Sequence, residues 1–223
     1  MTSKDTYLIA LNKLNKLITN NSQDLPEYLW VYNFNEAQSF WIAKTYKEVE
    51  KDQTAIRKLQ KILVPNKKIV DKVDKGIYSE FTLPDNFLNY SSSYTNINKC
   101  PFILENHLFE EHNIKTALKD AMWKPSLEFE ETLITMADNK ILVYKNESFE
   151  PESLTLSYYR KPVQIDIQDG FTHTDGTATI DQDPEFEDTN VYEIIDLAVQ
   201  QLAANFGMPD VYTTSTNKIK ESE

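Results

Sequence analysis

The spacing of hydrophobic residues divides this chain of 223 residues into helical ends and a strand-rich middle. From Tyr7 to Ile18 apolar side chains recur three and four positions apart, which is the spacing of one helix face. The same spacing returns at 35–64 and at 190–207. Between these segments, runs rich in Tyr, Phe, Thr and Ser predict strands at 78–83, 87–97, 127–136, 140–144 and 153–160, with a hairpin turn at 137–140.

These patterns predict an α+β fold in which helices from both chain ends pack together and a β-sandwich or meander module is inserted between them. We expect a helical body formed by residues 1–76 and 188–208 and a β module formed by residues 77–187. Two Asp-Gly pairs and many acidic residues predict an exposed acidic arm at 167–188. The polar residues 209–223 predict a flexible C-terminal tail.

Capping residues and composition set the expected element ends. Asn35 with Gln38 predicts the start of the second helix, and Asn190 with Glu193 predicts the start of the last one. The basic segment 66–76 is expected to be a bridge into the β module. Residues 110–125 are consistent with either a short helix or an inserted loop.

The charge and composition of the chain exclude several classes of protein. A net charge of −12 and a pI near 4.8 argue against a surface that grips nucleic acid or an anionic membrane. The longest apolar runs, such as Ile194–Val199, are far too short to span a bilayer. Cys100 is the only cysteine, and none of the four glycines belongs to a phosphate-binding or nucleophile-elbow motif. No cofactor and no enzymatic activity are expected.

Two clusters of polar residues contain side chains of the kinds that bind metal ions. His107 and His112 lie near Glu105, Glu110 and Glu111, but their spacing is not the HExxH pattern that places ligands on one helix face, so a solvated loop is favoured. Four acids alternate along the expected arm and would share one side of an extended chain: Asp181, Asp183, Glu185 and Glu187. Because Pro184 occupies the centre where a calcium loop needs glycine, a solvated acidic edge is favoured over a calcium site.

Two further sets of residues have simple structural interpretations. Glu128, Glu130 and Glu131 near Asp120 resemble paired catalytic carboxylates, but the alternation of the segment 126–133 is what a half-buried strand requires. The tryptophans Trp30, Trp41 and Trp123 would suit a carbohydrate-binding platform, although aromatic residues at such spacings usually belong to a core. No catalytic, cofactor-binding or metal-binding residue is therefore predicted.

The order of the elements resembles the head-to-tail adaptor proteins of short-tailed bacteriophages, which include tail accessory factors and tail tubular protein A. The resemblance rests on a corner, FTLPDNFLNY at 81–90, a return strand, LTLSYYRKPVQIDI at 154–167, and a final helix at 192–207. The motif residues are Leu83, Pro84, Asp85, Phe87, Tyr159, Arg160 and Pro162. The Lys/Asn-rich, Gly-poor composition is also similar to the ring proteins of crAss-like phages, while residues 98–124 match no family motif.

This resemblance implies a structural virion protein of the phage neck, assembled in the cytoplasm of a bacterial host. It implies a closed ring, commonly of about twelve copies, that binds the portal protein and neighbouring tail or neck rings. Double-stranded DNA would pass through the ring without specific binding, since an acidic lumen repels phosphate. The corner would launch the β module. The tail is the candidate partner-binding segment, with Val211, Tyr212, Thr213, Thr214 and Ile219 as its candidate contacts.

Two alternatives from other classes stay open at this stage. One is a carbohydrate-binding or host-recognition module of a phage tail, which requires several aromatic side chains exposed together on one β face. The other is a metal-dependent hydrolase built on His107, His112 and the nearby acids, which requires bound metal.

Overall fold

The computed structural model describes residues 1–17, 25–49, 51–97, 103–120, 122–168, 172–173 and 177–205. The chain divides into two compact units. A helical unit comprises Met1–Lys61 together with the described residues from Pro162 onward, and a β unit comprises Ile62–Lys161. The expected α+β class is confirmed, and the β unit is inserted in the sequence between the two parts of the helical unit.

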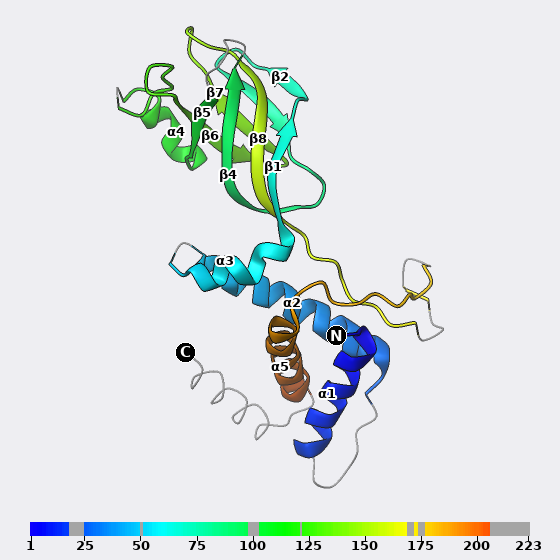
Figure 1. The fold of residues 1–223 in the computed structure, drawn as a ribbon. Helices are drawn as coiled ribbons and strands as arrows, with labels where there is room; N and C mark the ends of the chain where they lie inside the picture. Colours follow the sequence, from blue (N-terminus) through cyan, green and yellow to red (C-terminus); the bar gives the residue numbers. More distant parts are fainter. Residues whose placement is uncertain are drawn as a thin grey trace. The chain divides into compact units, whose positions relative to one another are not determined.

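The helical unit contains α1 (Ser3–Leu17), α2 (Glu27–Glu48), α3 (Gln53–Leu59) and α5 (Asp188–Asn205); a short 3-10 helix, η1, spans Gln60–Ile62. As expected, helices from the two chain ends pack together, because α5 lies against α1 and α2 (Figure 1). Trp30 and Trp41 of α2 and Val191, Ile194 and Ala198 of α5 are buried. The spacing of these residues on one face of each helix explains why both helices are stable only when packed.

The helix starts differ from those expected from the capping patterns. Asn35 is not a cap: it lies inside α2, and its side-chain amide accepts from Ile165 N–H at 2.9 Å and donates to the Ile165 carbonyl at 3.0 Å. Pro26, with an extended backbone (φ −61°, ψ 139°), precedes the first turn of α2 instead. Asn190 is likewise not a cap, because α5 begins two residues earlier and Asn190 is buried in its first turn.

The β unit is one eight-stranded curled sheet with strand order β1-β8-β4-β5-β6-β7-β3-β2. Its strands are β1 (Leu63–Ile69), β2 (Lys72–Asp74), β3 (Tyr78–Thr82), β4 (Phe87–Ile97), β5 (Ile103–Leu108), β6 (Glu131–Ala137), β7 (Lys140–Tyr144) and β8 (Pro151–Arg160). All neighbours are antiparallel except β5 and β6. The parallel pair needs a crossover, which includes the helix α4 (Glu111–Ala117).

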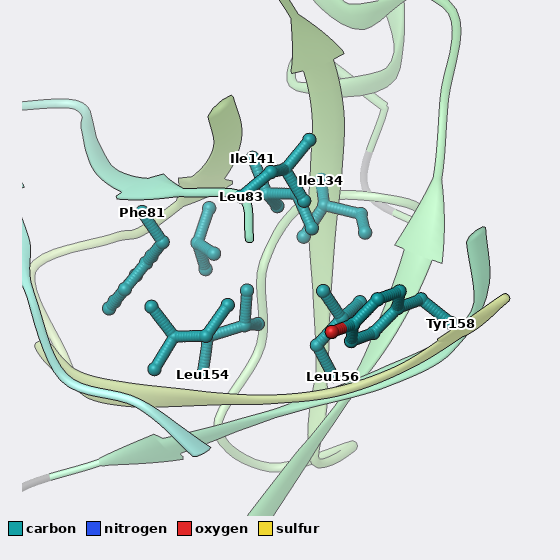
Figure 2. Packing of buried hydrophobic residues seen from close by; sticks show 9 residues of the cluster. Phe81, Leu83, Ile134, Ile141, Leu154, Leu156 and Tyr158 are labelled. Atoms are coloured by element: carbon teal, nitrogen blue, oxygen red, sulfur yellow. The ribbon is translucent and has the colours of Figure 1, made fainter. Parts of the chain in front are cut away.

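The core of the β unit lies inside the curl of the sheet. Figure 2 shows Phe81 and Leu83, Ile134 and Ile141, and Leu154, Leu156 and Tyr158 converging from different strands on one apolar interior. The alternation along β8 explains this arrangement, because Leu154, Leu156 and Tyr158 share one face of the strand. A second cluster, with Ile114 of α4 and Leu133 of β6, holds the crossover helix on the sheet.

Two boundaries differ from the sequence prediction. The expected basic bridge 66–76 contains much of β1 and all of β2, so the β unit begins at Ile62 rather than at residue 77. The described residues of the segment 162–187, expected within the β module, belong to the helical unit. None of the described helices has the length and apolar character needed to cross a membrane. The expected flexible tail, residues 209–223, lies outside the described residues.

Candidate functional site

The corner motif connects β3 to β4 within the sheet. Leu83 is buried, and its N–H donates to the Asn139 carbonyl at 2.9 Å, which ties the corner to the β6–β7 hairpin. A turn closes when Phe87 N–H donates to the Pro84 carbonyl at 2.9 Å. Asp85 is exposed on this turn. The expectation that this corner launches the β module is wrong, because β1, β2 and β3 precede it.

The structure brings the corner and the return strand together. Phe87 pairs with Arg160 in the β4–β8 register, and its ring stacks on Tyr158 with a centroid separation of 5.6 Å and an interplanar angle of 30°. Tyr159 is buried beside Leu63 of β1. The two motifs are therefore adjacent in space although about seventy residues separate them in sequence.

Asn86 holds the two motifs together, and sequence reasoning missed it. Its side-chain oxygen accepts from the Tyr158 hydroxyl at 2.9 Å, and its carbonyl accepts from Lys161 N–H at 2.7 Å. The Lys161 ammonium adds a contact to the Asp85 carbonyl at 3.3 Å. A signal was present, since asparagine is a preferred turn residue and Tyr158 falls on the buried face of β8. Pro162, the last motif residue, belongs to the helical unit and is half-buried there.

These contacts make the corner and the return strand a stabilising contact within the β unit. The Asn86 side chain, the Tyr158 hydroxyl and the backbone N–H groups named above all bind other parts of the same unit. The arrangement contains no nucleophile and base in contact. The contacts between the corner and the return strand fix the geometry where β4 begins and β8 ends.

The acidic arm is attached to the N-terminus of α1. Asp183 accepts from Ser3 N–H at 2.8 Å, and Asp188 accepts from the Met1 ammonium at 3.0 Å. Asp181 accepts from Gln168 N–H at 3.0 Å and contacts the Lys4 ammonium at 3.4 Å. Three of the four alternating acids accept hydrogen bonds from donors of the helical unit: Asp181 and Asp183 as described above, and Glu185 from Val163 N–H at 2.8 Å.

These contacts shift two pKa values. The hydrogen bond to the Asp188 carboxylate raises the pKa of the Met1 amine above its usual value. The hydrogen bond from Gln168 N–H lowers the pKa of the Asp181 carboxyl. Both shifts favour the charged forms, because each group is hydrogen-bonded in its charged state.

The two histidines considered as metal ligands have separate partners. His107 Nε2 on β5 lies 3.6 Å from the Glu131 carboxylate, whereas His112 Nε2 on α4 lies 3.4 Å from the Glu110 carboxylate. Within the described part of the chain, no three His, Cys, Asp or Glu side chains come together in a way that would hold a metal ion. Cys100 lies outside the described residues.

Glu128 and Glu130 lie on a turn rather than on the expected strand. Ser126 and Glu131 exchange backbone hydrogen bonds of 2.9 and 3.1 Å, and Glu130 has a left-handed backbone with φ of 56°. The strand predicted for 127–136 therefore starts only at Glu131. The prediction was wrong because the apolar and acidic residues of this segment alternate as they would in a strand. A tight turn can have the same alternation.

The tryptophans do not form a common platform. Trp30 and Trp41 are buried in the helical unit, where their indole N–H groups donate to Thr6 at 3.1 Å and to Glu193 at 2.8 Å. Trp123 belongs to the β unit, is half exposed, and packs its ring edge-on against Phe109 and His107.

Two open cavities lie at one end of the β unit. One, of about 470 Å³, is bounded by Gly76, Ile77 and the 145–150 segment, and the other, of about 830 Å³, by residues 124–130 with Asn146 and Ser148. Both are shallow and partly polar, unlike the enclosed apolar pockets that hold small molecules.

Comparison with known protein families finds none that matches this chain, and comparison with curated proteins finds no significant similarity. The candidate contacts in the tail, Val211, Tyr212, Thr213, Thr214 and Ile219, all lie outside the described residues.

Proposed function

We propose that this protein is a structural virion protein that forms a head-to-tail connector ring beneath a bacteriophage portal and joins the capsid to the tail. The observation that carries the proposal is the arrangement of the chain. Helices from both chain ends form one unit, and the β unit inserted between them is entered through β1 and left through the neighbouring strand β8. The adaptor resemblance implies the same order of helices, β module and final helix, although the β unit is entered through β1 and not through the corner.

The paired motifs add support to the proposal. The corner and the return strand, which are far apart in sequence, meet through Asn86, Phe87 and Tyr158. A resemblance made of unrelated turns and strand ends would give no reason for these two segments to be neighbours. The corner and the return strand therefore form one contact region within the β unit.

The charge of the chain is compatible with a passage for DNA. A net charge of −12 disfavours phosphate binding, and DNA sliding through a ring requires weak contact with the wall. A basic lumen would hold the duplex through counterion release and slow its movement. The proposed partners are other copies of this chain, the portal protein and adjacent neck or tail rings.

The test is a phage in which the gene for this chain carries an early stop codon. A connector between capsid and tail predicts DNA-filled heads without tails in electron micrographs of the lysate, with tails restored when the chain is supplied from a plasmid. Complete virions that lack this chain by mass spectrometry, with unchanged infectivity, would contradict the proposal. Complete virions that no longer adsorb to cells would favour the host-recognition alternative.

A further inference from the structure

Two exposed surfaces of the β unit have opposite charge and carry large apolar side chains. The acidic surface consists of Ile103, Met122, Trp123 and Phe129 together with Glu105, Glu128 and Glu130, and the exposed Lys124 lies among them. The basic surface consists of Val70 and Val73 together with Lys67, Lys68 and Lys75, and the exposed Asp71 and Asp74 lie in the same segment. We propose that the acidic surface of one copy of this chain binds the basic surface of a second copy, so that the β units associate head to tail.

The apolar side chains of the acidic surface are unusually exposed. Met122 is 81% exposed and Phe129 is 68% exposed, while the half-exposed Trp123 packs on the half-buried rings of His107 and Phe109. Aromatic and methionine side chains are enriched at the centres of protein interfaces. Several of them close together on a folded unit indicate an interaction site rather than ordinary surface.

The loop that carries Phe129 is held in place. Phe129 N–H donates to the Ser126 hydroxyl at 3.3 Å, and the Glu130 carbonyl accepts from Glu105 N–H at 2.7 Å. The second bond joins the loop to β5, which places Phe129 near Glu105 and the outer face of that strand. Because the loop is already ordered, binding loses less conformational entropy than a free loop would lose.

The basic surface lies where the two edges of the sheet come near each other. Val70 is 61% exposed in the two-residue connection between β1 and β2, and Val73 is 52% exposed on β2. Lys67 and Lys68 are exposed on β1, and Lys75 follows β2. Asp71 and Asp74 are exposed in the same segment, but Asp74 is bonded to Lys145, so the three lysines leave a net positive charge that complements the acidic surface.

The two surfaces lie on opposite sides of the β unit. β5 and β6 are the fourth and fifth strands of the sheet, whereas β1 and β2 are the first and the eighth. In a curled sheet the middle faces away from the edges, and Figure 1 shows α4 and β2 on opposite sides of the sheet. Complementary patches on opposite sides of one subunit give a heterologous contact, which closes into a ring when the rotation between copies allows it.

The contact is expected to use side chains rather than strand addition. β1 is an edge strand, but Pro65, the bulge between Val64 and Lys67, and the left-handed Asn66 (φ 51°) interrupt its backbone. The Asn66 N–H is already bonded to the Ser157 hydroxyl at 3.1 Å. Such features block pairing between sheet edges.

We infer a second copy of this chain as the partner because its basic surface has the charge that the acidic surface would bind. The acidic surface disfavours nucleic acid and anionic membranes. This inference deepens the proposed function, and it rests only on the self-association which that function includes. It is therefore tested without any other virion component.

The experiment is sedimentation velocity of the full chain over a range of concentrations, with two charge-reversed variants. One carries Glu105→Lys and Glu128→Lys, and the other carries Lys67→Glu and Lys68→Glu. We expect each variant alone to associate about tenfold or more weakly than the wild type, because like charges would face each other. An equimolar mixture of the two should regain association, since each reversed surface then meets an oppositely charged one.

Controls separate this result from loss of folding or from a general charge effect. Glu36→Lys with Lys51→Glu changes exposed charges of the helical unit and should associate like the wild type. The variant Phe129→Ser removes the apolar contact without a charge change, and it should weaken association while circular dichroism spectra stay unchanged.

Three results would overturn the inference: a wild-type chain that stays monomeric at every concentration, reversed variants that associate as tightly as the wild type, or a mixture that shows no recovery. Failure of this contact and failure of the adaptor role give different results. If the reversed variants still assemble on the phage portal, the interface is wrong and the adaptor role stands. If the mixture recovers association but virions form normally without the chain, the interface stands and the adaptor role is wrong.

Discussion

At the residue scale, the contact between the corner and the return strand depends on a few side chains. Tyr158 is almost fully buried, its ring stacks on Phe87, and its hydroxyl is bonded to Asn86. The ring supplies apolar burial inside the sheet, while the hydroxyl fixes the turn. These two contributions can be separated by substitution.

We predict that Tyr158→Phe lowers the free energy of unfolding of the β unit by about 1 kcal/mol, because a partly buried hydrogen bond is lost while the ring remains. Urea denaturation followed by circular dichroism measures this change. Tyr94→Phe is the matched control, since Tyr94 is exposed on β4 and should change the free energy by less than about 0.5 kcal/mol. Equal effects of the two substitutions would contradict the role of Asn86.

A second residue-scale prediction concerns pH. The hydrogen bond from Lys145 and, second, that from Gly76 N–H lower the pKa of the Asp74 carboxyl, and Lys140 lowers that of Glu80 in the same way. A carboxyl with a lowered pKa in the folded state stabilises the fold above its unfolded pKa, near 4, and this stability is lost as pH falls through the folded pKa.

We therefore expect the urea midpoint to be steady from about pH 7 to pH 5 and to decrease below about pH 4. In Lys145→Met the decrease should be shallower, because Asp74 then lacks its main partner. The same slope in both proteins would show that the contact between Asp74 and Lys145 does not contribute to the pH dependence.

At the element scale, the arm supplies the N-terminal contacts of α1. Ser3 N–H is one of the donors that an α-helix leaves unpaired at its start, and Asp183 satisfies it from a distant part of the sequence. The arm is thus a structural element of the helical unit.

We predict that Asp183→Ala destabilises the helical unit by about 1 kcal/mol, which is typical for loss of an N-terminal cap. Thermal unfolding followed at the helical band of circular dichroism measures the effect. Glu187→Gln, at an exposed position four residues later, is the control and should leave the transition unchanged. If Asp183→Ala also has no effect, the arm does not stabilise α1.

Comparison of elements shows what could be predicted from the sequence. β4 has the predicted bounds, 87–97, and β7 those at 140–144, because their alternating β-branched and aromatic residues face a core on one side only. The strands β1 and β2 were missed, since lysine-rich edge strands expose most of their side chains and show no apolar alternation. The strand β5 was missed because its segment, ILENHL, contains polar residues that bond inside the sheet, such as Asn106 with Thr95 and Ser93.

The candidate site was predictable in part. The corner and the return strand were both singled out by their residues, but their contact depends on the register of β4 against β8, which no local pattern contains. The attachment of the arm to α1 is long-range in the same sense. The apolar surface around Phe129 was hidden because the segment alternates like a strand.

At the scale of the whole molecule, the chain has two units with separate buried cores. Trp30 and Trp41 report on the helical unit, and Trp123 reports on the β unit. The two units can therefore be followed separately by fluorescence.

We predict that Leu156→Ala destabilises the β unit by about 2 to 5 kcal/mol, because it leaves a cavity in the interior of the sheet. When Leu156→Ala is combined with Trp123→Phe, the unfolding midpoint followed by the fluorescence of Trp30 and Trp41 should be the same as without Leu156→Ala. When Leu156→Ala is placed in a chain whose only tryptophan is Trp123, the unfolding midpoint should fall. A parallel fall of both signals would show that the two units unfold as one.

The measurement that tests the central claim most directly is the mass of the purified protein in solution, alone and mixed with the portal of the same virus. Light scattering gives the mass, and negative-stain images give the shape. The adaptor account predicts a closed ring, formed either by the protein alone or on the portal. A monomer that ignores the portal would contradict it.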